Sequence, residues 1–274
     1  MGTERIIGRP SRAAGGTRPI VRRSLTAAGE HHVSALHAGP ATATPVVCVH
    51  GAGISSRPLR PFVEILGETA ETWAIDLPGF GRSSKPPEPL DLIGLGDVLA
   101  DWTAAMDLPP VCLLGSSFGC QVATDVAVRH PARVRSLVLA GPTIDPAART
   151  WPRTVARWLR NSVRESVRMF PLNVADYRDC GTRGVIFAFR ESLRDRIEDR
   201  LPAVSVPTLV VRGERDALVP GPWAEEVTRL IPDARLVTVP GSPHMIPFRA
   251  PRALAAMVTD FLGEDADETG QADR

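Results

Sequence analysis

Short apolar runs recur along this chain, and most of them are separated by segments that carry apolar residues at helical spacing. The middle and later runs lack a strict alternation of polar and apolar residues, which is typical of strands that helices cover on both faces. This pattern predicts strand, helix, strand units, and therefore an α/β fold with a mostly parallel sheet. The candidate strands are Ile20–Ala27, His32–Ala38, Val46–Val49, Thr72–Ile75, Val111–Leu114, Val134–Leu139, Thr208–Val211 and Arg235–Val239.

The connecting segments divide the chain into a core, an insertion and two tails. Residues 91–106, 118–129 and 252–261 have helical periodicity, whereas only a turn at Gly29 separates the first two candidate strands, which predicts an antiparallel hairpin at one edge. Between residues 145 and 201 the alternation stops and the sequence becomes rich in Arg, which indicates an inserted helical cap. The predicted divisions are a flexible tail (1–18), a core (19–144 and 202–263), the cap (145–201) and an acidic tail (264–274).

The composition favours a globular protein that acts on small molecules. Of the 274 residues 43% are hydrophobic, and 32 basic side chains against 31 acidic ones leave a net charge of +1. Because so small a charge provides no overall field to hold nucleic acid or an anionic membrane, we expect a small-molecule substrate and no nucleic acid. The chain has no run of about 18 apolar residues, and residues 1–24 lack the apolar centre of a secretory signal. These features predict a cytoplasmic protein with no stable membrane insertion, either a monomer or a homodimer.

The cysteines and glycines give no sign of a metal or an organic cofactor. The four cysteines match neither a CxxC redox pair nor a zinc pattern, and three of them lie in apolar segments, so we expect buried free thiols. No glycine-rich phosphate loop followed by Lys-Ser or Lys-Thr is present. The cysteines are Cys48, Cys112, Cys120 and Cys180.

The sequence Gly-Ser-Ser-Phe-Gly at residues 115–119 lies directly between a candidate strand and a candidate helix. Glycines at these positions allow a tight turn, and such a turn lifts the central side chain clear of the backbone. Ser117 would then stand at the N-terminus of the helix, where the amide groups and the helix dipole favour developing negative charge. The context therefore predicts a nucleophilic Ser117 rather than an ordinary Gly-Ser turn.

A serine nucleophile needs a general base and an acid that orients the base, and the sequence offers both after candidate strands. His244 lies in the loop that follows the last candidate strand, and Asp216 lies just past the candidate strand Thr208–Val211. The order Ser, Asp, His along the chain is the one expected for this type of turn. Asp145, which follows the preceding candidate strand, is the alternative acid.

The segment Val49-His50-Gly51-Ala52-Gly53 provides a backbone that a substrate can approach closely, because it is rich in glycine and follows a candidate strand. We predict that the backbone N–H groups of Ala52 and Phe118 stabilise the oxygen that becomes negatively charged when the serine attacks. For His50 we predict a hydrogen bond that braces this loop, not a catalytic role.

Four motifs of this chain resemble those of the α/β-hydrolase family, specifically of members with a helical cap. The motifs are His50–Gly53, Asp76–Ser83, Gly115–Gly119 and the loops of Asp216 and His244. The resemblance spans residues 19–262 and implies an eight-stranded sheet whose second strand is antiparallel, a Ser-His-Asp triad and a cap after the sixth strand. It also implies that Asp76 belongs to a structural turn. Cys120 departs from the Gly or Ala that often follows this serine turn, although it is small enough for close helix packing.

A serine at the turn favours ester chemistry over that of the haloalkane dehalogenases and epoxide hydrolases of this family, which use an aspartate there. We therefore expect a serine hydrolase that cleaves a small or medium carboxylic ester through an acyl-enzyme intermediate. The same triad serves C–C bond hydrolases, thioesterases and biosynthetic cyclases, and some members of this fold are ligand-binding receptors with little turnover. The candidate substrate contacts, adjacent to the proposed catalytic residues, are Ile54, Ser116 and Met245.

The first half of the cap carries arginines three or four residues apart, with large apolar residues at other helical positions. A solvated helix face is the simplest interpretation, and the alternatives are a site for an anionic substrate and weak docking to an acidic surface. In the second half of the cap, Ile186, Phe187 and Phe189 either pack in the core or line a pocket over Ser117. The arginines are Arg153, Arg157, Arg160, Arg164 and Arg168.

Overall fold

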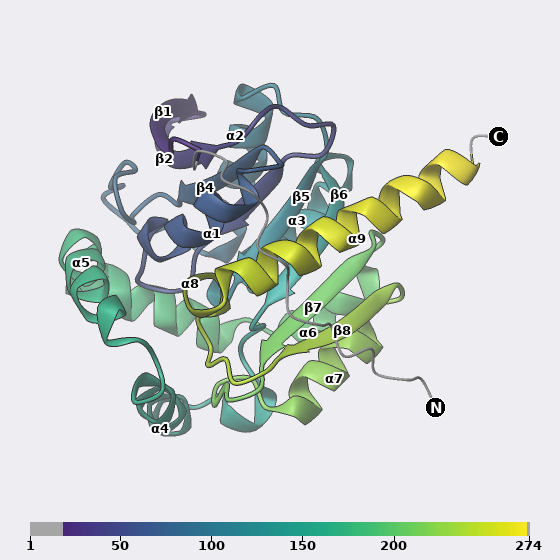
Figure 1. The fold of residues 1–274 in the computed structure, drawn as a ribbon. Helices are drawn as coiled ribbons and strands as arrows, with labels where there is room; N and C mark the ends of the chain where they lie inside the picture. Colours follow the sequence, from purple (N-terminus) through teal and green to yellow (C-terminus); the bar gives the residue numbers. More distant parts are fainter. Residues whose placement is uncertain (1–18, 273–274) are drawn as a thin grey trace.

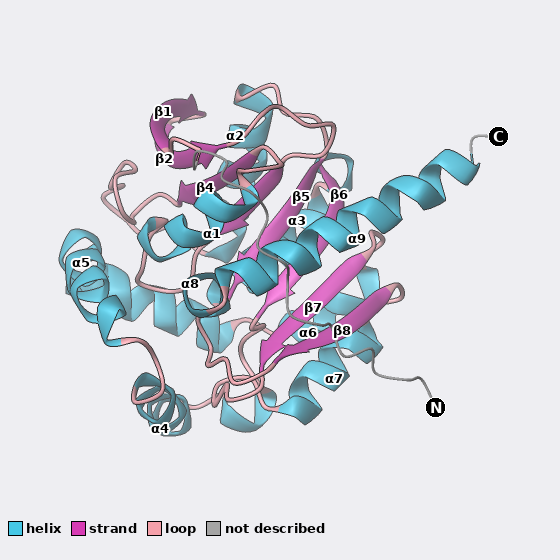
Figure 2. Cartoon of the chain, viewed as in Figure 1, coloured by secondary structure: helices cyan, strands magenta, loops and turns pink. Residues whose placement is uncertain are grey.

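The computed structural model describes residues 19–272, whose centre is a single eight-stranded sheet with helices on both faces (Figures 1 and 2). In space the strands follow the order β1-β2-β4-β3-β5-β6-β7-β8. Strand β2 pairs antiparallel with both β1 and β4, and every other pair is parallel. The strands are β1 (Arg22–Ala28), β2 (His31–Ala38), β3 (Val46–Val49), β4 (Thr72–Asp76), β5 (Val111–Ser116), β6 (Val134–Ala140), β7 (Thr208–Gly213) and β8 (Ala234–Val239).

The α/β fold, the edge hairpin and the antiparallel second strand are confirmed, and each candidate strand corresponds to one strand of the sheet. Several strands are longer at their carboxyl ends than the apolar runs. Strand β5 continues to Ser116, which pairs with Ala140, and β7 continues to Gly213, which pairs with Val239. The extensions arise because sheet pairing uses backbone groups and continues where the side chains have become small or polar.

Two hydrophobic cores, one on each face, hold the sheet. Along β5, Val111 and Leu113 belong to one core, whereas Cys112 and Leu114 belong to the other, as the two-residue period of a strand requires. The first core is covered by α2 (Leu92–Ala105), α3 (Phe118–Arg129) and α7 (Gly221–Leu230). The second is covered by α1 (Arg60–Leu66), α8 (Ile246–Arg249) and α9 (Pro251–Ala272). This double coverage explains the lack of polar alternation in the sequence.

Helix α9 continues into the segment 264–272, which the sequence predicts to be an acidic tail outside the core. It runs diagonally across the sheet in Figure 1, from α8 toward the C-terminus. The expected flexible tail at 1–18 lies outside the described residues.

The insertion between β6 and β7 is helical, and its two main helices, α4 and α5, lie toward the left of Figure 1. Its long helix bends at Gly181, where φ is +73° and ψ is 156°. Its last helical residues return to the main body, because Ile197 and Leu201 are fully buried in the core shared with α3. The helical segments are η3 (Pro146–Ala148), α4 (Trp151–Ser162), η4 (Val167–Met169), α5 (Phe170–Arg194), α6 (Ile197–Arg200) and η5 (Leu201–Ala203). Two further short turns are η1 (Arg57–Leu59) and η2 (Pro131–Arg133).

The four cysteines are free thiols, as predicted, although Cys180 is only half buried. Burial raises the pKa of the Cys48 and Cys120 thiols, which keeps them protonated. None of the helices between residues 19 and 272 has the length and hydrophobicity that a membrane crossing requires.

Candidate active site

Ser117 occupies the sharp turn between β5 and α3, with φ of +56° and ψ of −122°. Positive φ values are rare for residues with a side chain, and a strained backbone of this kind persists only where the surroundings enforce it. Here the Ser117 N–H donates to the carbonyl of Ala140, and the Ser117 carbonyl accepts from the N–H of Cys120. The turn therefore holds the serine at the first turn of α3, as the sequence predicts.

The glycines on each side of Ser117 are required by close backbone packing. A Cβ at Gly115 would lie 2.4 Å from the carbonyl oxygen of Gly119, and a Cβ at Gly119 would lie 2.3 Å from the carbonyl oxygen of Val49. Both separations are far below van der Waals contact. The two glycines thus let the turn sit against the end of β3, next to the loop that follows it.

His244 and Asp216, which lie 28 residues apart, form a buried pair at the carboxyl ends of β7 and β8. Nδ1 of His244 and Oδ2 of Asp216 are 2.7 Å apart. The other carboxylate oxygen, Oδ1, accepts the backbone N–H groups of Leu218 and Val219 at 2.8 and 3.0 Å. Because both oxygens are engaged, the carboxylate holds the imidazole ring in one orientation.

Asp145, the alternative acid, has other partners. Its Oδ1 accepts the N–H of Ala147, and its Oδ2 forms a 2.6 Å ion pair with Arg157 of the cap. The geometry therefore brings Asp216, not Asp145, to the histidine.

Electrostatics favour a basic His244. Burial alone would lower the pKa of its imidazole, but the charge and hydrogen bond of Asp216 and the charge of Glu165 outweigh this effect, so the pKa is raised. The Nε2 atom is buried and has no hydrogen-bond partner among residues 19–272. The nitrogen that a general base would use is therefore uncommitted.

The loop after β3 packs directly on the serine. A side chain at Gly51 would meet Cβ of Ser117 at 3.2 Å. Within the described residues, neither the Ala52 N–H nor the Phe118 N–H donates to another group of the protein. Two free amide donors thus lie beside the serine, one in the loop and one at the start of α3.

His50 braces this loop, as expected from the sequence. The ring is fully buried, its Nε2 accepts the N–H of Leu77 at 3.1 Å, and its Nδ1 lies 2.9 Å from the carbonyl of Gly51. Burial lowers the pKa of His50, so the ring is neutral, with its proton on Nδ1. Both ring nitrogens are therefore occupied in holding the backbone.

Asp76 is structural, as the resemblance implied. Its carboxylate accepts the N–H groups of Ser56 and Arg82 and forms an ion pair with Arg23. A Cβ at Gly81 would lie 2.3 Å from the Asp76 carboxyl carbon, which explains the glycine in this turn. The side chain is buried and joins two loops to strand β1.

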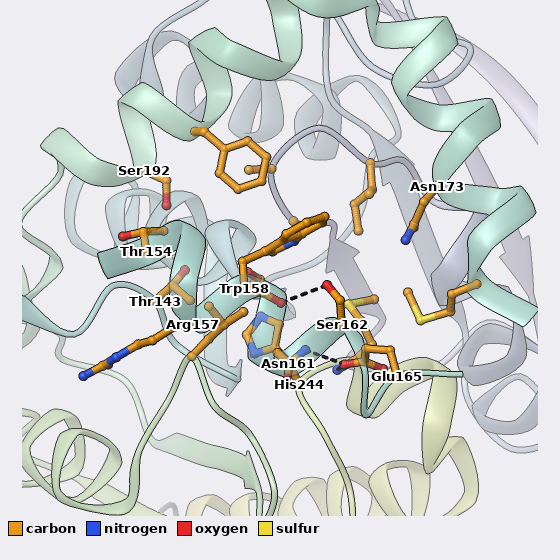
Figure 3. Close-up of a pocket in the computed structure, with 18 of the residues that line it drawn as sticks. Thr143, Thr154, Arg157, Trp158, Asn161, Ser162, Glu165, Asn173, Ser192 and His244 are labelled. Carbon is orange, nitrogen blue, oxygen red and sulfur yellow. Dashed lines mark hydrogen bonds between the residues drawn. The ribbon is translucent and has the colours of Figure 1, made fainter. Parts of the chain in front are cut away.

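Ser117 and His244 line one cavity of about 680 Å³ between the end of the sheet and the cap (Figure 3). Its wall also includes Ile54 and Met245, two of the predicted substrate contacts. The third, Ser116, does not reach the cavity. Ser116 is the last residue of β5, and its side chain points to the same face of the sheet as that of Leu114, toward the core covered by α1, α8 and α9.

The cap contributes most of the remaining cavity wall. Phe189 lines the cavity, whereas Phe187 lines a smaller second cavity and Ile186 is exposed. Figure 3 shows Asn161 and Glu165 beside His244, with the hydrogen bond between them. The other lining residues of the cap include Thr154, Arg157, Trp158, Val163, Val167, Met169, Phe170, Asn173, Val174, Tyr177 and Ser192.

Two consecutive cap residues bind the loops that carry the acid and the base. Arg164 donates to the carbonyl of Arg215, next to Asp216, at 2.8 Å. Glu165 Oε1 accepts the N–H of Met245, next to His244, at 3.0 Å. The turn between α4 and η4 therefore fixes both loops relative to the cap.

A second attachment joins the cap to the loop that follows Ala52. Asp176 of α5 is buried and accepts both the N–H and the hydroxyl of Ser55, at 3.1 and 2.6 Å. The same carboxylate is ion-paired with Arg57, which also binds Asp179. Every loop of the candidate site thus contacts either the cap or the end of the sheet.

Sequence reasoning missed two residues of this site. Glu165 is the single acid between residues 149 and 174, a segment with six arginines, and that contrast was a usable signal. Gly141 packs flat against the imidazole, since a Cβ there would lie 3.0 Å from both Cε1 and Nδ1 of His244. The only sequence signal for this contact was the position of Gly141 directly after a candidate strand. In the part of the chain that is described, no group of three His, Cys, Asp or Glu side chains is arranged to hold a metal ion.

Comparison with known proteins gives the family. Residues 46–257 match the model of the "Alpha/beta hydrolase family". The chain is 25% identical over 268 residues to a poly(3-hydroxyalkanoate) depolymerase of Ectopseudomonas oleovorans, a match that covers 90% of this chain and 94% of the relative. It is 27% identical to a pimeloyl-[acyl-carrier protein] methyl ester esterase of Neisseria meningitidis, over 84% of this chain and 80% of the relative. Some other curated relatives are longer, and the chain spans only about a quarter to a half of their length.

Among solved structures, a serine hydrolase involved in carbazole degradation superimposes with a TM-score of 0.75. The match covers 89% of this chain and 99% of that structure, at 25% sequence identity. This solved hydrolase thus shares the architecture of the chain over nearly its whole length.

Proposed function

Because the chain belongs to the alpha/beta hydrolase family, we propose that it is a serine hydrolase that cleaves small or medium carboxylic esters through an acyl-enzyme intermediate. Ser117 is the nucleophile, His244 the general base and acid, and Asp216 the residue that orients and charges the imidazole. The substrate is a small acyl compound held in the cavity under the cap.

One observation carries this proposal: His244, which is hydrogen-bonded to the buried Asp216, lines the same cavity as the strained Ser117. A serine needs a base to become nucleophilic at neutral pH, and the base needs a fixed tautomer. The Nδ1 hydrogen bond to Asp216 places the proton on Nδ1 and leaves Nε2 as the free acceptor.

The reaction follows from these positions. Ser117 Oγ attacks the carbonyl carbon of the ester while His244 Nε2 takes the hydroxyl proton. The negative oxygen of the tetrahedral intermediate accepts hydrogen bonds from the Ala52 and Phe118 N–H groups, each worth about 10²- to 10³-fold in rate. Collapse of the intermediate breaks the ester C–O bond, and the Nε2 proton passes to the leaving alcohol. Water, deprotonated by the same nitrogen, then attacks the acyl group, so the acid is released and the serine is restored.

The relatives and the cavity support ester chemistry. The two curated relatives named above carry ester-cleaving names, a depolymerase of a hydroxyalkanoate polyester and a methyl ester esterase. A cavity of about 680 Å³ lies within the range of small-molecule sites and accommodates a medium-sized acyl chain.

The test is covalent labelling of the purified protein with a fluorophosphonate, read by mass spectrometry of its peptides. The expected result is one adduct on Ser117 and its loss in Ser117→Ala, together with a fall of about 10⁴-fold or more in the hydrolysis of an aryl ester. Ser116→Ala is the matched control, because that neighbouring hydroxyl does not reach the cavity, and it should label and turn over as the wild type does. Absence of any adduct on Ser117 would refute the proposal.

A panel of acyl donors identifies the bond that is cleaved. Esters, thioesters and a 1,5-diketone of matched acyl length should all be offered to the wild type, and kcat/KM compared. The proposal predicts the highest value for the oxygen esters. A preference for the diketone or the thioester would keep Ser117 as the nucleophile but reassign the reaction.

A further inference from the structure

The outer side of the cap exposes an unusual number of large apolar side chains. Val163, Val167 and Phe170 have 84%, 87% and 72% of their surface exposed. Large exposed apolar side chains that gather in one segment mark a surface that contacts something else. On helix α4 the apolar positions are spaced by four residues, so they share one side of the helix. The set, which we call the outer face of the cap, is Trp151, Val155, Leu159, Val163, Val167 and Phe170.

The segment that carries this outer face is rich in arginine. Of the six arginines between residues 149 and 174, Arg149 and Arg157 are ion-paired with Glu198 and Asp145. The others have no carboxylate partner among residues 19–272. The single acid of the segment, Glu165, points inward to Asn161 and the Met245 N–H. The arginines without a carboxylate partner are Arg153, Arg160, Arg164 and Arg168.

The outer face is continuous with the cavity. Val163, Val167 and Phe170 are both strongly exposed and part of the cavity wall. An apolar surface therefore runs from the outside of the cap to the space in front of Ser117. A helix face that contacts only solvent would not be expected to carry an apolar surface that continues into the cavity.

The charges decide between possible partners. A symmetric dimer through this face would bring the unpaired arginines of two copies into one interface without acids of the segment to pair with them, which is unfavourable. A helix with exposed apolar residues and arginines is instead the pattern of segments that lie in the interface of anionic lipid surfaces. The overall net charge of +1 does not oppose this, because the attraction is local and acts within about 10 Å.

We propose that the outer face of the cap binds the surface of anionic lipid bilayers reversibly, with Val155, Leu159 and their apolar neighbours among the acyl chains and the arginines at the headgroups. The cavity mouth then faces the bilayer. This inference goes beyond the proposed function and does not rest on its chemistry.

The test is sedimentation of the full-length chain with vesicles. The expected result is binding to vesicles of phosphatidylcholine and phosphatidylglycerol in equal parts at about 0.05 M salt, and weak binding at about 0.5 M salt or to phosphatidylcholine alone. The double variant Arg160→Gln/Arg168→Gln should weaken binding about tenfold or more. Val155→Ser/Leu159→Ser should weaken it to a similar extent. None of these four residues lines the cavity, so cleavage of a water-soluble ester should stay at the wild-type level.

A charge-matched control separates this face from general basicity. Arg133→Gln/Arg252→Gln removes two exposed arginines outside the cap and should leave vesicle binding unchanged. Equal effects of both arginine pairs would overturn the proposal, as would wild-type binding by the cap variants. It is also overturned if sedimentation equilibrium shows a dimer that Val155→Ser/Leu159→Ser dissociates. Vesicle binding by a chain that never labels at Ser117 would refute the proposed function and leave this inference standing.

Discussion

Glu165 of the cap accepts a hydrogen bond from the backbone N–H of Met245, the residue that follows His244. The contact joins the cap to the loop of the proposed general base, and it places a carboxylate near enough to the imidazole to raise its pKa. Asn161 donates to the same oxygen of Glu165, so the carboxylate is held in place by two donors. A cap residue thus influences both the position and the charge of the proposed base.

Glu165→Gln tests the electrostatic part of this influence. The charged groups that act on the His244 ring are Asp216 and Glu165, and both raise its pKa. A general base must be neutral, so kcat/KM falls as the pH drops through the pKa of His244. Glutamine keeps an oxygen for the Met245 N–H but removes the charge, so the acid limb of the pH profile should move to lower pH.

The matched control is Asp199→Asn, which removes an exposed carboxylate from α6. Its acid limb should coincide with that of the wild type. If Glu165→Gln changes the height of the profile but leaves the position of its acid limb in place, Glu165 has only a structural role.

The pair Asp216→Asn and Asp145→Asn tests which acid serves the histidine. Asparagine at 216 removes the charge that stabilises the imidazolium and allows the wrong tautomer, so kcat should fall by about 10⁴-fold. Asp145 binds Arg157 and the Ala147 N–H instead, and its substitution should lower kcat by less than about tenfold. The measurement is steady-state hydrolysis of an aryl ester by both variants, and the reverse order of effects would reassign the acid.

The fold could be predicted from the sequence because its central strands are buried on both faces. Val46–Val49 and Val111–Ser116 have no polar alternation, and every position of both strands is buried. What could not be predicted is where pairing or helix formation continues without apolar side chains. Helix α9 runs through 264–272, where backbone hydrogen bonds maintain the helix and leave no apolar period to detect.

The residues of the candidate site that lie in turns after parallel strands could be predicted from the sequence. The turns after β5, β7 and β8 meet because parallel strands end at one edge of the sheet, so Ser117, Asp216 and His244 were expected together. Adjacency to Ser117 did not predict the position of the Ser116 side chain correctly, because the two-residue period of the strand points it away from the cavity. Glu165 comes from the cap, whose placement depends on tertiary contacts that no local pattern encodes.

Gly141→Ala should damage the site through contact with the imidazole. Gly141 has φ of +68°, and a Cβ there would lie 3.0 Å from Cε1 and Nδ1 of His244. The positive φ alone costs about 1–2 kcal/mol of stability for a residue with a side chain. Displacement of the ring should in addition lower kcat/KM by about 10²-fold or more.

Gly241→Ala isolates the backbone effect, because Gly241 has a similar φ of +64° and no atom within 4 Å of its would-be Cβ. Its thermal midpoint should fall by less than that of Gly141→Ala, which also displaces the ring, while kcat/KM stays within about threefold of the wild type. Equal activities of the two variants would mean that the Gly141 contact does not control the ring.

The attachment of the cap to the loop after Ala52 should depend on Asp176 far more than on Asp179, although both bind Arg57. Asp176 is buried and also accepts the N–H and hydroxyl of Ser55, so Asp176→Ala should lower the free energy of unfolding by about 2–4 kcal/mol. Asp179 is partly exposed and has only the ion pair, so Asp179→Ala should cost less than about 1 kcal/mol.

Urea unfolding measures both values, and limited proteolysis shows whether the cap is released before the core unfolds. Since the Ser55 loop also carries Ala52, a released cap should lower kcat together with stability in Asp176→Ala alone. Equal unfolding energies for the two variants would show that Arg57, which they share, holds the cap rather than the buried bonds to Ser55.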